Sequence, residues 1–357
     1  MSTSPSPQSK DGKSWRNKLR NLLLVLAIFY TIQWGLGTYL AHANADKFES
    51  IMSLMPEGPL KEVTGRSSSP YERIVGNGWH VSMAALASLD PTLLRAIDQS
   101  ATFDDTHWSV LNQSLDRAHT FLELAKSCQR QFPELSWEQG YAMPMPHLAP
   151  IRNYVKAVCA SANHAYQKGE RNSGRLLDAV RMIRLGVGEP VLISHLVQLA
   201  CLGLVLDSLD SCGPLEPTEA RALLAELEGY DLEEQRRLAN IGEVFFGLSY
   251  WKQLQGGDVS PLEVLEAINA PLPQFFSIQF YRLIPLLPLW VEWDKRAYLD
   301  IMHDSIEGGN VDEGSIPTVC ILTRLIVPSL GNSKAQTMAM AAKLESARAK
   351  LRVMAGN

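Results

Sequence analysis

Residues 22–41 read LLLVLAIFYTIQWGLGTYLA, and this stretch decides how the chain is placed in the cell. No Asp, Glu, Lys or Arg occurs from Asn21 to Ala45, and Gln33 is the most polar side chain in the middle of the stretch. A helix needs about twenty predominantly apolar residues to cross the hydrocarbon core of a bilayer. We therefore expect residues 21–45 to form a transmembrane anchor and its exit.

Charged residues flank this stretch with opposite signs on its two sides. The basic cluster before it comprises Lys10, Lys13, Arg16, Lys18 and Arg20, whereas Asp46 and Glu49 follow it. Positively charged flanks are retained on the cytoplasmic side of a membrane. The sequence thus predicts a single-pass protein of the inner (cytoplasmic) membrane. Residues 1–20 form a basic cytoplasmic tail, and residues 46–357 form an extracytoplasmic domain, periplasmic in a bacterium with two membranes.

A cleaved signal peptide is the alternative to an anchor. Small residues at Ala41, Ala43 and Ala45 would allow cleavage after Ala43 or after Ala45. The apolar stretch is longer than the ~7–15 residues of an ordinary signal peptide, so we favour an uncleaved anchor. The domain is exported in both cases.

The stretch Val191–Leu206 is also almost wholly apolar, but its flanking charges argue against a second span. It contains His195 and Gln198, Arg184 precedes it, and Asp207 follows it. A segment that returns to the cytoplasm would have its basic residues after it, not before it. The stretch is also short for a transmembrane span. We expect a buried core helix in which His195 is a hydrogen-bonded side chain.

A third apolar stretch, Pro271–Trp293, is interrupted by Arg282 and by internal prolines. Proline removes a backbone donor and bends a helix, so we expect bent helical structure packed in the core or lying against a surface. A lipid-facing domain would be indicated by one exposed aromatic patch beside the anchor, formed by Phe275, Phe276, Phe280 and Trp290.

Helix start signals recur along the rest of the chain. Proline fits the first turn of a helix, where its missing N–H has no partner to lose. Five residue pairs would place a proline in the first turn of a helix in this way: Asp90-Pro91, Ala149-Pro150, Glu189-Pro190, Glu216-Pro217 and Ser260-Pro261. Ser260 with Glu263, and Asp231 with Glu234, have the spacing of N-terminal caps. We expect helices at 91–100, 105–131, 150–168, 171–187, 190–212, 217–229, 231–254, 261–268, 277–307 and 333–354.

Strand signals are nearly absent. Only Glu72–Val81 could form a small hairpin, because Asn77-Gly78 is typical of a two-residue turn; an irregular loop is the alternative. The sequence therefore predicts an all-α fold.

Residues 159–169, CASANHAYQKG, followed by a helix through Leu176 and Val180, resemble the helix-turn-helix of a tetratricopeptide unit. The resemblance covers residues 159–180, about one repeat, and no regular period follows it. We expect an N-terminal transmembrane helix followed by an irregular stack of antiparallel helical hairpins rather than a repeat array.

A longer resemblance covers residues 176–209, LLDAVRMIRLGVGEPVLISHLVQLACLGLVLDSL, and residues 322–353, LTRLIVPSLGNSKAQTMAMAAKLESARAKLRV. These segments look like parts of uncharacterised membrane-anchored helical proteins of planctomycete-like bacteria, for which no activity is established. The resemblance implies a location and a helical fold, but no site.

Composition narrows the functional classes. The chain has 33 Lys and Arg against 38 Asp and Glu, so it offers no broad attraction to nucleic acid. Its five cysteines include no C-x-x-C pair, which argues against a zinc ribbon or a thioredoxin-type motif. Cys201 and Cys212 on one helix would be roughly 16 Å apart, too far for a disulfide. Other bridges remain open in an oxidising compartment, and we expect the set mainly to be small buried side chains.

Two Asp-x-x-His pairs, Asp116 with His119 and Asp300 with His303, place a carboxylate and an imidazole on one helix face, as metal ligands require. A di-iron bundle would use Glu-x-x-His pairs and further glutamates, and the composition produces such pairs by accident. We therefore interpret both as solvated helix faces and predict neither a metal nor a cofactor. No nucleophile elbow, P-loop or dinucleotide fingerprint occurs, so the catalytic residues stay unknown.

Two further segments could bind a partner. Trp290 and Trp293 flank Glu292, an arrangement that suits sugars or cations, although helix packing explains it equally well. The amphipathic segment Lys334–Val353 could cap the domain or dock on a partner, and docking within the chain is the simpler interpretation.

The functional hypothesis is a membrane-anchored, extracytoplasmic helical interaction or scaffold protein of the cell envelope, with an unidentified protein partner. The alternative is an enzyme of an uncharacterised helical class that acts on an envelope polymer. A convergent pocket of carboxylates and aromatics would favour the enzyme, whereas a broad groove would favour the scaffold.

Overall fold

In the computed structural model the described part of the chain consists of helices and of the turns and irregular segments that join them. The structure describes residues 11–54, 97, 103–126, 145, 147–170, 174–184, 189–256, 288–309, 314, 316–317, 320, 323–324 and 327–356. Within these residues no strand occurs, so the predicted all-α class is confirmed. The hairpin considered at Glu72–Val81, the helix expected at 261–268, and Phe275, Phe276 and Phe280 lie outside the described residues. So do residues 277–287 of the helix expected at 277–307, and all but residue 97 of the one expected at 91–100.

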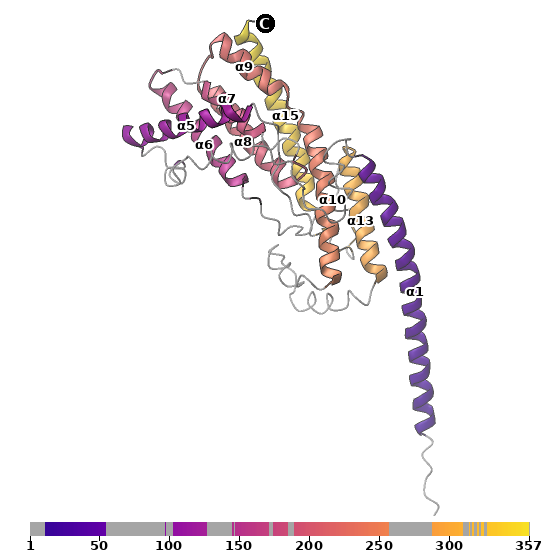
Figure 1. Ribbon diagram of the computed structural model, residues 1–357. Coiled ribbons are helices and arrows are strands. Elements are labelled where there is room, and N and C mark those ends of the chain that lie inside the picture. The colour runs from indigo at the N-terminus through magenta and orange to yellow at the C-terminus, as the bar shows by residue number, and fades with distance from the viewer. Residues whose placement is uncertain are drawn as a thin grey trace, which may run out of the picture.

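Most helix positions agree with the sequence patterns. The helices are α1 (Asp11–Ser53), α5 (Asp105–Lys126), α6 (Leu148–Gln167), α7 (Gly174–Arg184), α8 (Leu192–Ser211), α9 (Pro217–Glu228), α10 (Leu232–Gly256), α13 (Pro288–Ile306) and α15 (Pro328–Ala355) (Figure 1). At the start of α10 the backbone N–H of Glu234 donates to Asp231 Oδ1 (3.0 Å), as the spacing of the pair predicted. Glu216 and Glu219 form a full capping box before α9.

The start of α8 differs from the expected one. The helix begins at Leu192, with Val191 in extended conformation as the N-cap, so Pro190 lies outside the first turn. The backbone of Pro190 packs directly on Gly242 of α10, where a Cβ would lie 1.6 Å from the carbonyl oxygen of Pro190. Residues 189–191 therefore pack tightly against α10, and helix α8 starts only after them.

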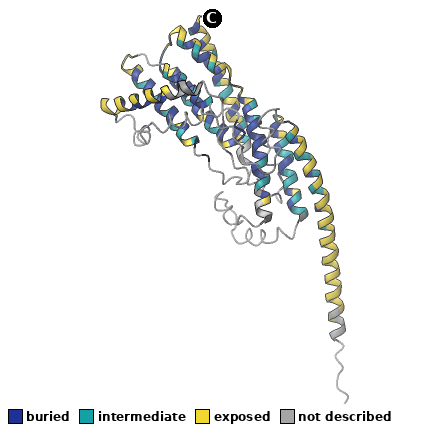
Figure 2. Cartoon of the chain, in the orientation of Figure 1, coloured by how far each residue is buried: buried dark blue, intermediate teal, exposed yellow. Residues whose placement is uncertain are grey.

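Helix α1 is one continuous element of 43 residues, about 65 Å long. The part from Leu19 to Tyr39 projects away from the other helices with mostly exposed side chains, and the last turns of α1 lie on α13 (Figures 1 and 2). The boundary expected at residue 45 therefore falls inside a helix. Two segments, Asn17–Ser53 and Leu192–Ser211, are long and apolar enough to cross a membrane by length and composition.

The end of α1 joins the domain through specific contacts with α13. The side chain of Asn44 is nearly fully buried and donates to the backbone oxygen of Glu292 (2.8 Å). Arg296 Nη1 donates in turn to the carbonyl oxygen of Ala43 (3.1 Å). Lys47 lies 3.4 Å from the carboxylate of Asp300. From the contact of Asn44 with Glu292 to that of Lys47 with Asp300 both residue numbers increase, so α1 and α13 run in the same direction.

Helix α10 runs opposite to α13. Arg236 Nη1 donates to the carbonyl oxygen of Ser305 (2.9 Å), and the Tyr298 hydroxyl donates to the carbonyl oxygen of Glu243 (2.7 Å). One turn beyond Glu243, Gly247 lets the two helices approach closely, since a Cβ there would lie 2.2 Å from the Tyr298 hydroxyl oxygen. A hydrophobic cluster fills the space between α1, α10 and α13, with Ile51, Val244, Trp251, Leu299 and Met302 among its buried members.

A second hydrophobic cluster is built around α8. Helices α6, α7, α10 and α15 all pack on α8, and most of its side chains are buried, which confirms that this apolar stretch is a core helix. Helix α15 lies across α8 and α9 and buries Leu344, Ala347 and Leu351 in this cluster. The C-terminal amphipathic segment thus docks within the chain.

Candidate functional site

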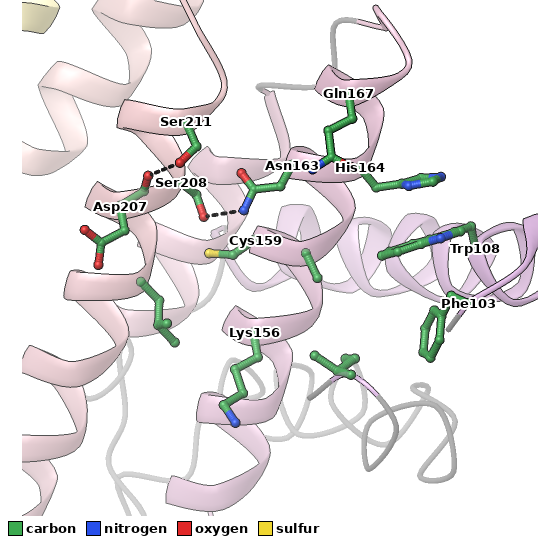
Figure 3. A pocket seen from close by; sticks show the side chains of 13 residues that line it. Phe103, Trp108, Lys156, Cys159, Asn163, His164, Gln167, Asp207, Ser208 and Ser211 are labelled. Atoms are coloured by element: carbon green, nitrogen blue, oxygen red, sulfur yellow. Dashed lines mark hydrogen bonds between the residues drawn. The ribbon is translucent and has the colours of Figure 1, made fainter. Parts of the chain in front are cut away.

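A groove of about 690 Å³ opens where α5, α6 and α8 meet (Figure 3). Its lining combines aromatic, amide, hydroxyl and apolar groups: Ile97, Phe103, Trp108, Lys156, Cys159, Ala160, Asn163, His164, Gln167, Leu204, Asp207, Ser208 and Ser211. Ligand sites are typically concave, largely apolar, and supplied with a few placed polar groups. This groove is the candidate binding site.

Aromatic rings form one wall of the groove. Trp108 of α5 stacks on His164 of α6, with ring centroids 4.0 Å apart and planes 9° from parallel, and Phe103 meets the Trp108 ring edge-on at 5.1 Å (Figure 3). Burial and, next, the charge of Lys168 lower the pKa of His164, which keeps the ring neutral near pH 7. The wall is therefore an uncharged stacking surface.

Amide and hydroxyl groups form the facing wall. Asn163 Nδ2 donates to Ser208 Oγ (3.4 Å), and the thiol of Cys212 donates to Asn163 Oδ1 (3.2 Å). The Asp207 carboxylate at the rim is paired with Lys343 at 2.5 Å. Burial raises the pKa of Cys159 to about 12, so this thiol stays protonated and is not a nucleophile at neutral pH. The described lining of the groove presents hydrogen-bonding and stacking groups, and Asp207 supplies its one carboxylate.

The structure places the four residues of the Asp-x-x-His pairs against other partners. Arg175 donates to Asp116 (2.8 Å), and His119 bonds Asp178 of α7 (2.7 Å). In α13, Arg296 donates to Asp300 (3.0 Å), while His303 lies 3.6 Å from Glu307. Neither pair points its two members at one shared point. Among the residues that the structure describes, no group of three or more His, Cys, Asp or Glu side chains could hold a metal ion.

Sequence reasoning missed the pair formed by His119 and Asp178. The Asp178 carboxylate is buried and bonds His119 Nδ1, whereas the imidazole itself is about half exposed. A buried carboxylate that orients an exposed imidazole is the arrangement of a general base. The two residues lie on different helices, 59 positions apart, so no local spacing could reveal them.

His195 is a core histidine, as predicted. Thr337 Oγ1 donates its hydrogen to the carbonyl oxygen of Ser333 (2.8 Å), so His195 Nε2, at 2.9 Å, is the donor to Thr337 Oγ1. Burial, followed by the charge of Arg236, lowers the pKa of His195 from 6.5 to about 4. The ring is neutral at pH 7 and joins α8 to α15.

Another buried cluster consists of His147, Glu189 and Ser194. His147 Nε2 and the Ser194 hydroxyl both bond the same oxygen of Glu189, so the carboxylate lies between the other two. A nucleophilic triad requires the imidazole in the middle, next to the hydroxyl. This cluster therefore fixes the start of α8 rather than activating Ser194.

Helix packing accounts for the carboxylates near the two tryptophans of α13. Glu292 accepts from Asn44 (3.0 Å) and from Lys295 (2.8 Å), and the buried Asp294 accepts from Thr323 (2.6 Å). Trp293 is still 49 % exposed. These contacts agree with the helix-packing interpretation of this segment, and Trp293 is its exposed aromatic ring.

The cysteines in the described part of the chain are buried and unbridged: Cys159, Cys201, Cys212 and Cys320. This agrees with their interpretation as small buried side chains. Cys128 lies outside the described residues.

Comparison with protein-family models, with curated protein sequences and with solved structures finds no match for this chain.

Proposed function

We propose that the protein is a single-pass, membrane-anchored interaction module of the cell envelope. Its N-terminus would lie in the cytoplasm, and its helical domain would dock an envelope protein in the groove between α5, α6 and α8. The observation that carries this proposal is the continuity of α1, whose apolar part is exposed and whose last turns are built into the domain.

The exposed part of α1 is unsuited to water. Consecutive residues from Leu22 to Leu26 are all more than half exposed, so apolar side chains cover every face of the helix. A helix that is apolar all round is normally buried in a core or in a membrane. The twenty residues from Leu22 to Ala41 span about 30 Å, which equals the thickness of the hydrocarbon core.

The end of α1 supports an uncleaved anchor over a cleaved signal peptide. Cleavage after Ala43 or after Ala45 would cut inside a continuous helix. It would also interrupt the segment in which Ala43 accepts from Arg296 and Asn44 donates to Glu292. Retention of α1 completes this interface.

The groove supports docking rather than catalysis as the main function. Its carboxylate is neutralised by Lys343, its thiol is protonated, and its aromatic wall is uncharged. We further propose that the domain is an irregular stack of antiparallel helical hairpins, a class that binds proteins without a sequence motif. The opposite directions of α10 and α13 support this description.

A photocrosslinking experiment tests the docking site. Benzoylphenylalanine replaces Gln167, an exposed residue of the groove, in the full-length protein within its native membrane. The matched control carries it at Ala225, an exposed residue of α9 that does not line the groove. A protein adduct from position 167 that position 225 does not give would support the docking site. Equal adducts, or none at position 167, would contradict it.

An enzyme that acts on an envelope polymer is the second candidate function, and the His119–Asp178 pair is the observation that favours it. Purified full-length protein is incubated with isolated envelope polymers, and soluble products are measured. If the pair is catalytic, Asp178→Asn should lower the rate by roughly 100-fold or more, because the imidazole loses its orienting carboxylate. If the unaltered protein releases no soluble product, the enzyme hypothesis is rejected.

A further inference from the structure

The base of the domain, where α13 begins and α10 ends, lies beside the apolar part of α1 (Figure 1). Trp290 and Trp293 lie one turn apart in the first turns of α13, and Lys252 is exposed near the end of α10. Since α1 continues into the domain without a linker, the height of these residues above the proposed span can be derived from contacts along the helices.

The hydrogen bond between Asn44 and Glu292 sets the relative level of the two helices. The amide of Asn44 reaches the backbone oxygen of Glu292 at 2.8 Å, so these residues lie at nearly the same height. Asn44 is three residues beyond Ala41, the last residue of the apolar stretch, which corresponds to about 5 Å along the helix. Trp293 is one residue further, and Trp290 is two residues lower.

These heights match the polar boundary of a bilayer. The headgroup region adds about 5–8 Å on each side of the hydrocarbon core, so Trp293 falls inside it and Trp290 falls at its inner edge. Tryptophan is enriched at this level because its ring is apolar and its N–H can bond to headgroups. Trp293 is 49 % exposed, and Tyr39, about 9 Å lower on α1, is 72 % exposed.

We propose that Trp293, together with the partly buried Trp290, forms a second membrane contact that rests in the headgroup layer of the extracytoplasmic leaflet. The inference rests on the proposed role of α1 as a span. A single helix leaves a domain free to tilt and to turn about the helix axis. A second contact, on a helix fixed to α1, sets one orientation and holds the groove at a constant direction relative to the membrane.

Lipid photocrosslinking tests this contact in the full-length protein in its native membrane. Benzoylphenylalanine is placed singly at Trp293, at Tyr39 and at Asp304, and lipid adducts are identified by mass spectrometry. Position 304 is the matched control, because it lies on the same helix, is exposed, and is about 16 Å further from the proposed bilayer. We expect lipid adducts at positions 39 and 293, with the yield at 293 roughly ten-fold or more above that at 304.

The other outcomes separate the two proposals. Adducts at position 39 without any at position 293 would overturn the second contact and leave the anchor intact. Equal yields at positions 293 and 304 would also overturn it. No lipid adduct at position 39 would contradict the anchor, and the second contact with it.

Discussion

Asn44 of α1 uses both hydrogens of its side-chain amide on one residue of α13, the backbone oxygen of Glu292 at 2.8 Å and its carboxylate at 3.0 Å. These two residues are 248 positions apart in the sequence, and their contact fixes the proposed anchor to the domain. Loss of this buried amide removes both bonds, while the backbone oxygen of Glu292 keeps its helical bond from the N–H of Arg296.

Replacement of Asn44 should weaken this junction. We expect Asn44→Leu to lower the free energy of unfolding by about 1–3 kcal/mol, because two hydrogen bonds are lost and one of them is to a carboxylate. Asn44→Asp should be worse, because it places a second carboxylate next to Glu292. Chemical denaturation of the full-length protein in detergent measures both. Asp46→Asn, at an exposed position two residues away, is the control and should change little.

Gly247 should tolerate no side chain. Gly247→Ala places a Cβ 2.2 Å from the Tyr298 hydroxyl, so α10 and α13 must separate or the bond from Tyr298 to Glu243 must break. We expect a loss of about 1–3 kcal/mol, typical of overpacking. Gly174→Ala, at the start of α7 with its nearest neighbour 3.9 Å away, should be neutral or slightly stabilising. Equal stability of the two variants would refute this close approach.

Arg236 should be the most sensitive arginine in α10. Its side chain is fully buried, donates to the carbonyl oxygen of Ser305, and forms a salt bridge with Glu233 at 2.6 Å. Arg236→Met removes both contacts and leaves the carbonyl oxygen of Ser305 with only its longer bond from the Gly308 N–H (3.3 Å). We expect a loss of about 1–3 kcal/mol by thermal or chemical denaturation. Arg221→Met, at an exposed position in α9, should cost almost nothing, and a comparable loss there would show that the effect is not specific to the buried site.

His195 should make the protein less stable in acid. The folded state holds its pKa at about 4, below its ordinary value of 6.5, so the unfolded chain binds the proton more readily between these two pH values. The free energy of unfolding should therefore fall as the pH falls from 6.5 to 4, by roughly 3 kcal/mol in total.

The contribution of His195 can be isolated with His195→Gln, which retains a donor for Thr337 Oγ1 but does not titrate. The variant should lose this part of the pH dependence, measured as the difference between two denaturation series from pH 7 to pH 4. Parallel curves for the two proteins would show that His195 does not titrate as described.

Local signals predicted the helices well. Glu216-Pro217 marked the start of α9, and the cap at Asp231 marked that of α10, because start signals act over three or four residues. The absence of charge between Asn21 and Ala45 likewise predicted a long apolar helix. These features depend on neighbouring residues alone, so the sequence displays them directly.

The candidate site could not be predicted in the same way. The wall formed by Trp108 and His164 joins α5 to α6, and the partner of His119 is on α7. Such contacts depend on how whole helices pack, which local patterns do not encode. The same limit explains why Pro190 was expected inside α8. Its place is set by close packing on Gly242, a contact with α10 that no start signal contains.

The most direct test of the central claim is the intact mass of the natural protein recovered from carbonate-washed membranes. A membrane-retained chain that still carries residues 1–45 is the result that this account predicts, since α1 is both the anchor and part of the domain. A chain that begins at Asn44 or Asp46 and is found in the soluble fraction would contradict it.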